Sequence, residues 1–146
     1  MNPPAHEILL RVRYSETDQM GTYYNSRPLE WFECARSELM RALGRPYTEI
    51  EAEGLFMPVR EAHVEYLGKA RYDDLLRVRS VLTMPSRAQV RFDVEITQAA
   101  TGSPVCRGYT IHAVVNAAGR PVRPPPWLIE LVSCETAQSR KDASAH

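Results

Sequence analysis

After residue 55 the chain contains four stretches whose residues follow a period of two. Alternation with period two places successive side chains on opposite faces of a sheet, and it predicts half-buried β-strands. Within the third stretch, Val90 and Phe92 share one face while Arg91 and Asp93 share the other. The predicted strands cover residues 56–67, 75–84, 88–97 and 105–116. Tight connections at 85–86 and 101–103 favour a mostly antiparallel sheet.

One long helix is predicted before these strands, over residues 27–43. Its signals are Ser26 as a cap, Pro28 in the first turn, Leu29, Phe32, Ala35 and Leu39 at helical spacing, and Gly44 with Pro46 beyond the end. Cys34, among apolar neighbours, is expected to pack as a small hydrophobe. A further strand over residues 8–14 precedes the helix. One long helix against an antiparallel sheet of five or six strands is α+β architecture.

Length and composition restrict what the protein can be. The chain has 146 residues, which is the size of one domain, and its 18 basic side chains balance 18 acidic ones. This balance argues against a nucleic-acid partner, and the short apolar runs argue against a membrane span or a secretory signal. We therefore expect a cytoplasmic protein with one domain over residues 1–134. The polar residues 135–146 are predicted to be a disordered tail.

The segment from Tyr14 to Arg36 carries the strongest chemical signal. It places Asp18 on a glycine-containing loop that leads directly into the predicted helix, where backbone N–H groups near Asn25 lie at the positive end of the helix dipole. A thioester carbonyl gains negative charge when it is attacked, and such charge is stabilised at a helix N-terminus. Asp18 can supply the base or the nucleophile. Glu16 is expected to orient the loop or to pair with an arginine.

The same segment resembles a family signature. Tyr14-x-Glu16-Thr17-Asp18-x-x-Gly21-x-x-Tyr24, followed by Leu29-x-x-Phe32-Glu33-x-Ala35-Arg36, is similar to the signature of hotdog-fold acyl-CoA thioesterases. The 4-hydroxybenzoyl-CoA and Tol-Pal-associated types are the nearest groups. The resemblance implies a hotdog fold, in which a curled antiparallel sheet wraps one long helix. It also implies an acyl-CoA substrate, no cofactor or metal, and a homodimer or homotetramer.

Site residues follow from this resemblance and from the chemistry of the substrate. Asp18 and Asn25 are expected to be catalytic, and Gly21 and Tyr24 to contact the substrate. Relatives often carry histidine where this chain has Asn25, so the acid–base role must rest on Asp18. The candidate cations for the coenzyme A phosphates are Arg60, Lys69 and Arg87.

Two other functions remain open at this point. Some hotdog proteins are hydratases or dehydratases, although these generally use an aspartate together with a histidine. A non-catalytic acyl-CoA-binding module would use the same pocket without releasing thiol. In either case, residues 105–115 are apolar on both faces and need more cover than one helix gives, which predicts a dimer whose sites face residues 56–67 of the partner.

Overall fold

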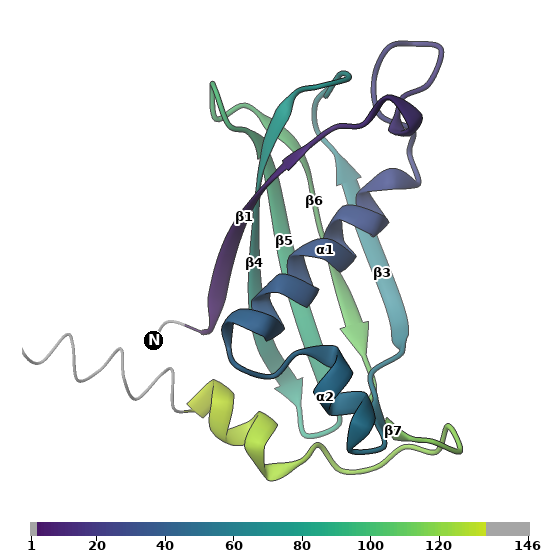
Figure 1. The fold of residues 1–146 in the computed structure, drawn as a ribbon, viewed down its shortest axis with the longest axis vertical. Helices are drawn as coiled ribbons and strands as arrows, with labels where there is room; N and C mark the ends of the chain where they lie inside the picture. Colours follow the sequence, from purple (N-terminus) through teal and green to yellow (C-terminus); the bar gives the residue numbers. More distant parts are fainter. Residues whose placement is uncertain (1–2, 134–146) are drawn as a thin grey trace, which may run out of the picture.

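A five-stranded antiparallel sheet curves around one long helix in the computed structural model, which describes residues 3–133 (Figure 1). The elements in chain order are β1 (Ala5–Arg11), the 3-10 turn η1 (Tyr14–Glu16), α1 (Arg27–Ala42), α2 (Tyr47–Ala52), β2 (Leu55–Phe56), β3 (Val59–Tyr66), β4 (Leu75–Ser86), β5 (Gln89–Gln98), β6 (Pro104–His112) and β7 (Val115–Asn116). Residues 126–133 form a further helix. The predicted α+β architecture is confirmed.

Two of the predicted strands are each divided in the structure. The stretch 56–67 separates into β2 and β3, and the stretch 105–116 separates into β6 and β7. The β2 and β7 segments pair with each other as a small second sheet. Pro58, which lies between β2 and β3, has no N–H group to donate to a ladder, so the pairing is interrupted there.

The strand order in the main sheet is β1-β4-β5-β6-β3, and all pairs are antiparallel. β6 is therefore an interior strand, as its apolar composition predicts, although β5 is the middle one. β1 and β3 are the two edges of this sheet. Among residues 3–133, β3 pairs with β6 alone, and no other strand lies along its second edge.

α1 lies across the inner face of the sheet (Figure 1). It buries Trp31, Phe32, Ala35 and Leu39. Close approach of helix and sheet depends on Gly108 in β6, because a Cβ atom there would lie 3.0 Å from the Phe32 ring and 1.8 Å from the carbonyl oxygen of His63. The prediction for Cys34 is wrong, since this thiol is exposed.

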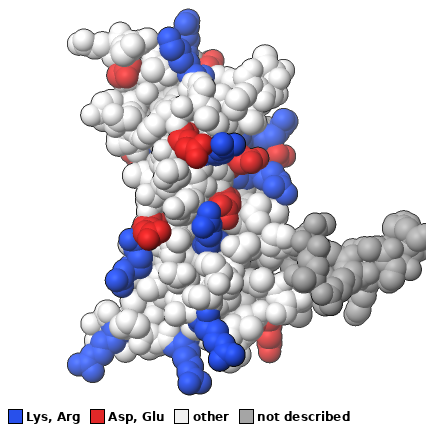
Figure 2. Space-filling model, turned by 180° about the vertical axis from the view of Figure 1, so that it is seen from behind, with Lys and Arg blue, Asp and Glu red and all other residues white. Residues whose placement is uncertain are grey.

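The outer face of the sheet is covered by charged side chains of alternating sign. The strand registers place Glu7, Arg79, Glu95, Arg107 and Glu65 side by side in one row that crosses all five strands. Figure 2 shows acidic and basic side chains interspersed over this face. Within the row, Arg107 Nε lies 2.9 Å from Glu65 Oε2. Opposite charges that face each other across strands stabilise the observed registers.

No helix within residues 3–133 is long and apolar enough to cross a membrane. The domain boundary predicted at residue 134 and the disorder predicted for residues 135–146 lie outside the described residues.

Candidate active site

A buried carboxylate fixes the loop that leads into α1. Glu16 is 3% exposed. Its Oε2 accepts a hydrogen bond of 2.8 Å from the Trp31 indole, and its Oε1 accepts one of 2.7 Å from the Arg13 N–H. The Glu16 carbonyl also accepts from the Tyr24 N–H at 2.8 Å. Glu16 thus holds the loop against the first turns of α1, which confirms the orienting role predicted for it.

Asp18 stands at the start of a tight turn and is half-buried. Its Oδ1 accepts from the Met20 N–H at 2.8 Å, and its main chain bonds to Thr22 and Gly21. Gly21 has a φ of +80°, a conformation in which glycine is favoured. Within residues 3–133 no donor reaches the second carboxylate oxygen, Oδ2. Asp18 therefore shapes the turn through one oxygen and keeps the other available.

The start of α1 offers an unpaired backbone donor. No acceptor for the Asn25 N–H lies among the described residues, while the Asn25 carbonyl accepts a hydrogen bond of 2.5 Å from the Tyr66 hydroxyl. Ser26 occupies the cap position but its side chain makes no capping bond, contrary to the prediction. Because this cap is missing, N–H groups at the positive end of α1 remain free for an anionic partner.

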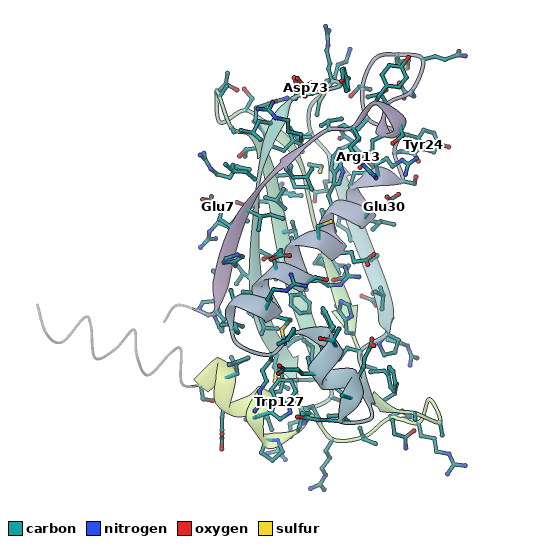
Figure 3. All side chains as sticks on the ribbon, viewed as in Figure 1. Glu7, Arg13, Tyr24, Glu30, Asp73 and Trp127 are labelled. Atoms are coloured by element: carbon teal, nitrogen blue, oxygen red, sulfur yellow. The ribbon has the colours of Figure 1, made fainter. Side chains whose placement is uncertain are left out.

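These groups meet in one surface hollow of about 240 Å³. Figure 3 shows Tyr24 at the end of the molecule where α1 begins. The residues that line the hollow are Asp18, Thr22, Tyr23, Tyr24, Asn25, Tyr66, Gly68 and Lys69. The structure thus brings together four of the predicted site residues, which are Asp18, Tyr24, Asn25 and Lys69. Gly21 shapes the turn beside them but does not line the hollow.

Tyr23 forms the inner wall of the hollow. Its hydroxyl lies 3.3 Å from the carbonyl oxygens of both Gly68 and Val105, and its ring centroid lies 5.3 Å from that of Trp31. Burial, with smaller effects of Cys106 and Tyr66, raises the pKa of Tyr23 to about 12. Tyr23 therefore keeps its proton at neutral pH and acts as a spacer between the loop and the sheet.

Arg60 and Arg87 lie away from this hollow within one protomer. Arg87 lines a second hollow of about 690 Å³ with Arg123, Met84, Ser86, Pro124 and Ile129. That hollow lies near Trp127, at the end of the molecule opposite Tyr24 (Figure 3). α1, which begins beside the Asp18 hollow, has 16 residues and is about 24 Å long. Arg60 lines a third hollow, with Glu61 and Gln89.

Sequence reasoning missed Arg123, which shares the second hollow with Arg87. The signal was the run of three prolines that follows it, since such a run fixes the position of the chain beside it. Neither His63 nor His112 lines the Asp18 hollow. His112 is buried, and its two ring nitrogens bond to the Met57 carbonyl and the Thr110 hydroxyl. Among residues 3–133, no group of three His, Cys, Asp or Glu side chains is placed to hold a metal ion.

Residues 12–132 match the sequence pattern of the thioesterase-like superfamily. The chain belongs to this superfamily. The assignment confirms the resemblance to hotdog thioesterases seen in the sequence.

The chain is similar in sequence or structure to several known proteins. The putative acyl-CoA thioesterase YneP of Bacillus subtilis is 37% identical over 65 residues, which are 44% of this chain and 47% of that protein. The acyl-CoA thioester hydrolase YbgC of Escherichia coli O6:H1 is 30% identical over 99 residues, 68% of this chain and 74% of that protein. The crystal structure of a DHNA-CoA thioesterase from Staphylococcus aureus superposes with a TM-score of 0.85 at 26% identity, covering 94% of this chain and 95% of that one. This last similarity confirms the predicted hotdog fold.

Proposed function

We propose that this protein hydrolyses acyl-CoA thioesters in the hollow between Asp18 and the start of α1, releasing a carboxylic acid and free coenzyme A. One observation carries the proposal: the free Oδ2 of Asp18 and the unpaired N–H of Asn25 belong to residues that line the same hollow. A nucleophile or base and an oxyanion donor are the two groups that acyl transfer requires. Membership in the superfamily and the activities named for the Escherichia coli and Staphylococcus aureus relatives support hydrolysis of a CoA thioester.

The reaction follows from the position of these two groups. The thioester carbonyl oxygen accepts a hydrogen bond from the Asn25 N–H, so the charge that develops on attack lies at the positive end of α1. In one route, Asp18 attacks the carbonyl carbon, the thiolate of coenzyme A leaves, and water then cleaves the mixed anhydride. In the other, Asp18 removes a proton from the water that attacks. Both routes consume one water and need neither a metal nor a cofactor.

The remaining residues of the hollow bind the substrate. Tyr24 is 51% exposed and offers its ring to the acyl group. Lys69 places a cation at the rim. Gly21 keeps the turn tight enough for Asp18 to reach the carbonyl carbon.

The site is completed by a second copy of the chain. The open edge of the sheet carries Val59, Tyr66 and, just after β3, Leu67, which are 45–53% exposed although largely apolar. Two β3 strands that pair antiparallel about a two-fold axis bury these side chains and close both open edges. The same operation brings the Arg87 end of one protomer beside the Asp18 end of the other. Arg60 and Arg87 of the partner subunit then supply cations for the phosphates of coenzyme A. Dimers of this kind can pair further into a tetramer.

A thiol-trapping assay over short-chain, long-chain and aromatic acyl-CoAs tests the proposal. Asp18→Asn should lower kcat by at least about a hundredfold with little change in substrate binding, whereas Asp93→Asn, on the outer face, should leave kcat unchanged. Activity of Asp18→Asn within about threefold of wild type, which is about 0.7 kcal/mol of barrier, would exclude Asp18 as the reacting carboxylate. Loss of enoyl-CoA absorbance without thiol release would indicate a hydratase, and binding without turnover a non-catalytic module. The cytoplasmic location and the single domain over residues 1–134 stay predictions, which cell fractionation and limited proteolysis test.

A further inference from the structure

We infer that the dimer is centred on Val64, so that His63 of each protomer faces Glu65 of the partner subunit and Val59 of the partner subunit borders the Asp18 hollow. The inference rests on the dimer of the proposed function. It adds the register of the two strands and a residue that selects the acyl group.

Side-chain direction limits the registers available to two β3 strands. Residues directly opposite each other in an antiparallel pair point to the same face of the sheet. Glu61, His63 and Glu65 lie on the outer face, since they pair with the outward residues of β6. Ala62 and Val64 lie on the inner face, which α1 covers. A two-fold axis can therefore pass through any one residue of the segment 61–65, and each choice sets different outer-face groups opposite one another.

Three of these five registers set like charges against each other. An axis at Glu61 or at Glu65 places that carboxylate opposite its own copy. An axis at His63 places Glu61 opposite Glu65 twice and the two imidazoles opposite each other. Like charges directly opposite destabilise a strand pair, so these registers are disfavoured.

The choice between the remaining two depends on the backbone. An axis at Ala62 requires Pro58 to pair with Tyr66 and draws the irregular segment between Val59 and Glu61 into the ladder. Pro58 has no N–H to donate. An axis at Val64 pairs residues 62–66 with one another, and their pairing with β6 is regular. The irregular segment then falls opposite residues 67–69, beyond the end of β3. It also places His63 opposite Glu65 twice.

The contacts of His63 and Glu65 within one protomer are compatible with a His63–Glu65 pair between protomers. Glu65 already accepts from Arg107 Nε through Oε2 at 2.9 Å, whereas its Oε1 lies 3.6 Å from His63 of its own chain, too far for a hydrogen bond. The His63 ring is stacked on Tyr109 at 5.3 Å and 19°, and the Arg91 guanidinium lies over the same Tyr109 ring at 3.9 Å. Glu65 Oε1 thus makes an ion-pair contact but no hydrogen bond within its own chain, so it can accept a hydrogen bond from His63 of the partner subunit. The row of alternating charges then continues across the axis.

This register determines what the partner adds to the catalytic hollow. With the axis at Val64, residues 59 and 60 of the partner subunit continue past the end of the ladder and come close to Gly68 and Lys69, both of which line the hollow. Val59 is 45% exposed and pairs beside the inward-facing His112, so its side chain points to the inner face. Val59 of the partner subunit is therefore an apolar wall for the acyl group and a specificity-determining residue.

Disulfide mapping tests the register without reference to activity. In a background with Cys34→Ser and Cys134→Ser, Val64→Cys should form an intersubunit disulfide on mild oxidation, because directly opposed Cα atoms lie about 4.5–5.5 Å apart, within the range that a disulfide bridges. The matched control is Ala62→Cys, whose two copies would be offset by four residues, or about 13 Å, and should not cross-link. Cross-linking through Ala62→Cys, or through neither variant in a sample that light scattering shows to be dimeric, would overturn the register. A monomeric protein would overturn the dimer as well.

The selectivity of the variants tests the role of Val59. Val59→Ala should shift the ratio of kcat/KM between aromatic and short-chain acyl-CoAs by at least about tenfold, since the wall next to the acyl group is removed. The control is Leu9→Ala, an exposed apolar residue on the opposite edge strand β1, which should leave the ratio unchanged. An unchanged ratio for Val59→Ala in a cross-linkable dimer would remove Val59 from the site. If no acyl-CoA is hydrolysed at all, the proposed function fails, while the disulfide result still decides the register.

Discussion

Replacement of Glu16 by alanine should destabilise the protein strongly, because this carboxylate connects the Asp18 loop to α1. The side chain is 3% exposed and accepts hydrogen bonds from the Trp31 indole and from the Arg13 N–H. Hydrogen bonds to a charged group contribute about 1.5–3 kcal/mol each, and a buried donor left unpaired keeps its desolvation cost. Since the Arg13 N–H is only partly buried, we expect a loss of about 3–5 kcal/mol for Glu16→Ala.

Further substitutions at Glu16 and Trp31 show how much each hydrogen bond contributes to the free energy of unfolding. Glu16→Gln keeps one acceptor oxygen and should lose about half as much, because its amide NH₂ group faces a donor. At this chain length a loss of 1 kcal/mol lowers Tm by about 2–4 °C, so Glu16→Ala should melt at least about 6 °C below wild type. In a double-mutant cycle with Trp31→Phe, the coupling energy should be at least about 1 kcal/mol.

Urea denaturation and calorimetry measure these differences. Glu38→Ala, which removes an exposed carboxylate of α1 that pairs with Arg41, is the control and should change the free energy of unfolding by no more than about 0.5 kcal/mol. A loss of less than about 1 kcal/mol for Glu16→Ala would show that contacts other than those of Glu16 hold the loop.

Three further predictions concern separate parts of the molecule. Burial, against a smaller raising effect of the Met57 carbonyl, lowers the pKa of His112 below 6.5. As the pH falls, the unfolded chain therefore protonates this imidazole before the folded protein does, and the free energy of unfolding should decrease below about pH 6.5. His112→Gln should remove this part of the pH dependence. Urea denaturation that gives the same pH dependence for both proteins would contradict the prediction. Gly108→Ala should cost more than about 2 kcal/mol, because the new Cβ would overlap the His63 carbonyl oxygen, and an unchanged Tm would show that β6 and β3 can separate at no cost. Arg87→Ala should raise KM several-fold for acyl-CoA but not for an acyl-pantetheine, which lacks the nucleotide; equal effects on both substrates would exclude phosphate binding by Arg87.

Local patterns were sufficient to predict the elements of the fold, because period two and helical spacing are properties of contiguous residues. The errors occur where tertiary contacts decide. The divisions between β2 and β3 and between β6 and β7 depend on the pairing of β2 with β7, which lie about sixty residues apart. Cys34 was expected to be buried with its neighbours, but the turn of α1 directs Trp31, Phe32 and Ala35 to the sheet and leaves position 34 on the other side.

The part of the candidate site that comes from one contiguous segment could be predicted from the sequence. Asp18, Tyr24 and Asn25 lie within eight consecutive residues, so one loop and one helix start place them together. Lys69 was included as a candidate cation, and only the fold brings it to the loop. The free N–H of Asn25 depends on the absence of a Ser26 cap, which no sequence pattern indicates. The pairing of Arg87 with Arg123 depends on the contact between a hairpin and the helix at residues 126–133.

The open edge of β3 also affects how a single protomer behaves in solution. A nascent or dilute chain exposes unpaired backbone groups beside Val59, Tyr66 and Leu67, which are features of an aggregation-prone strand. Glu61 and Glu65 act as gatekeepers on this strand, since their charges discourage irregular stacking. Surface engineering that replaces them with β-branched residues would raise strand propensity and is expected to lower soluble yield. If the proposed dimer forms, storage above its dissociation constant should protect the protein from this loss.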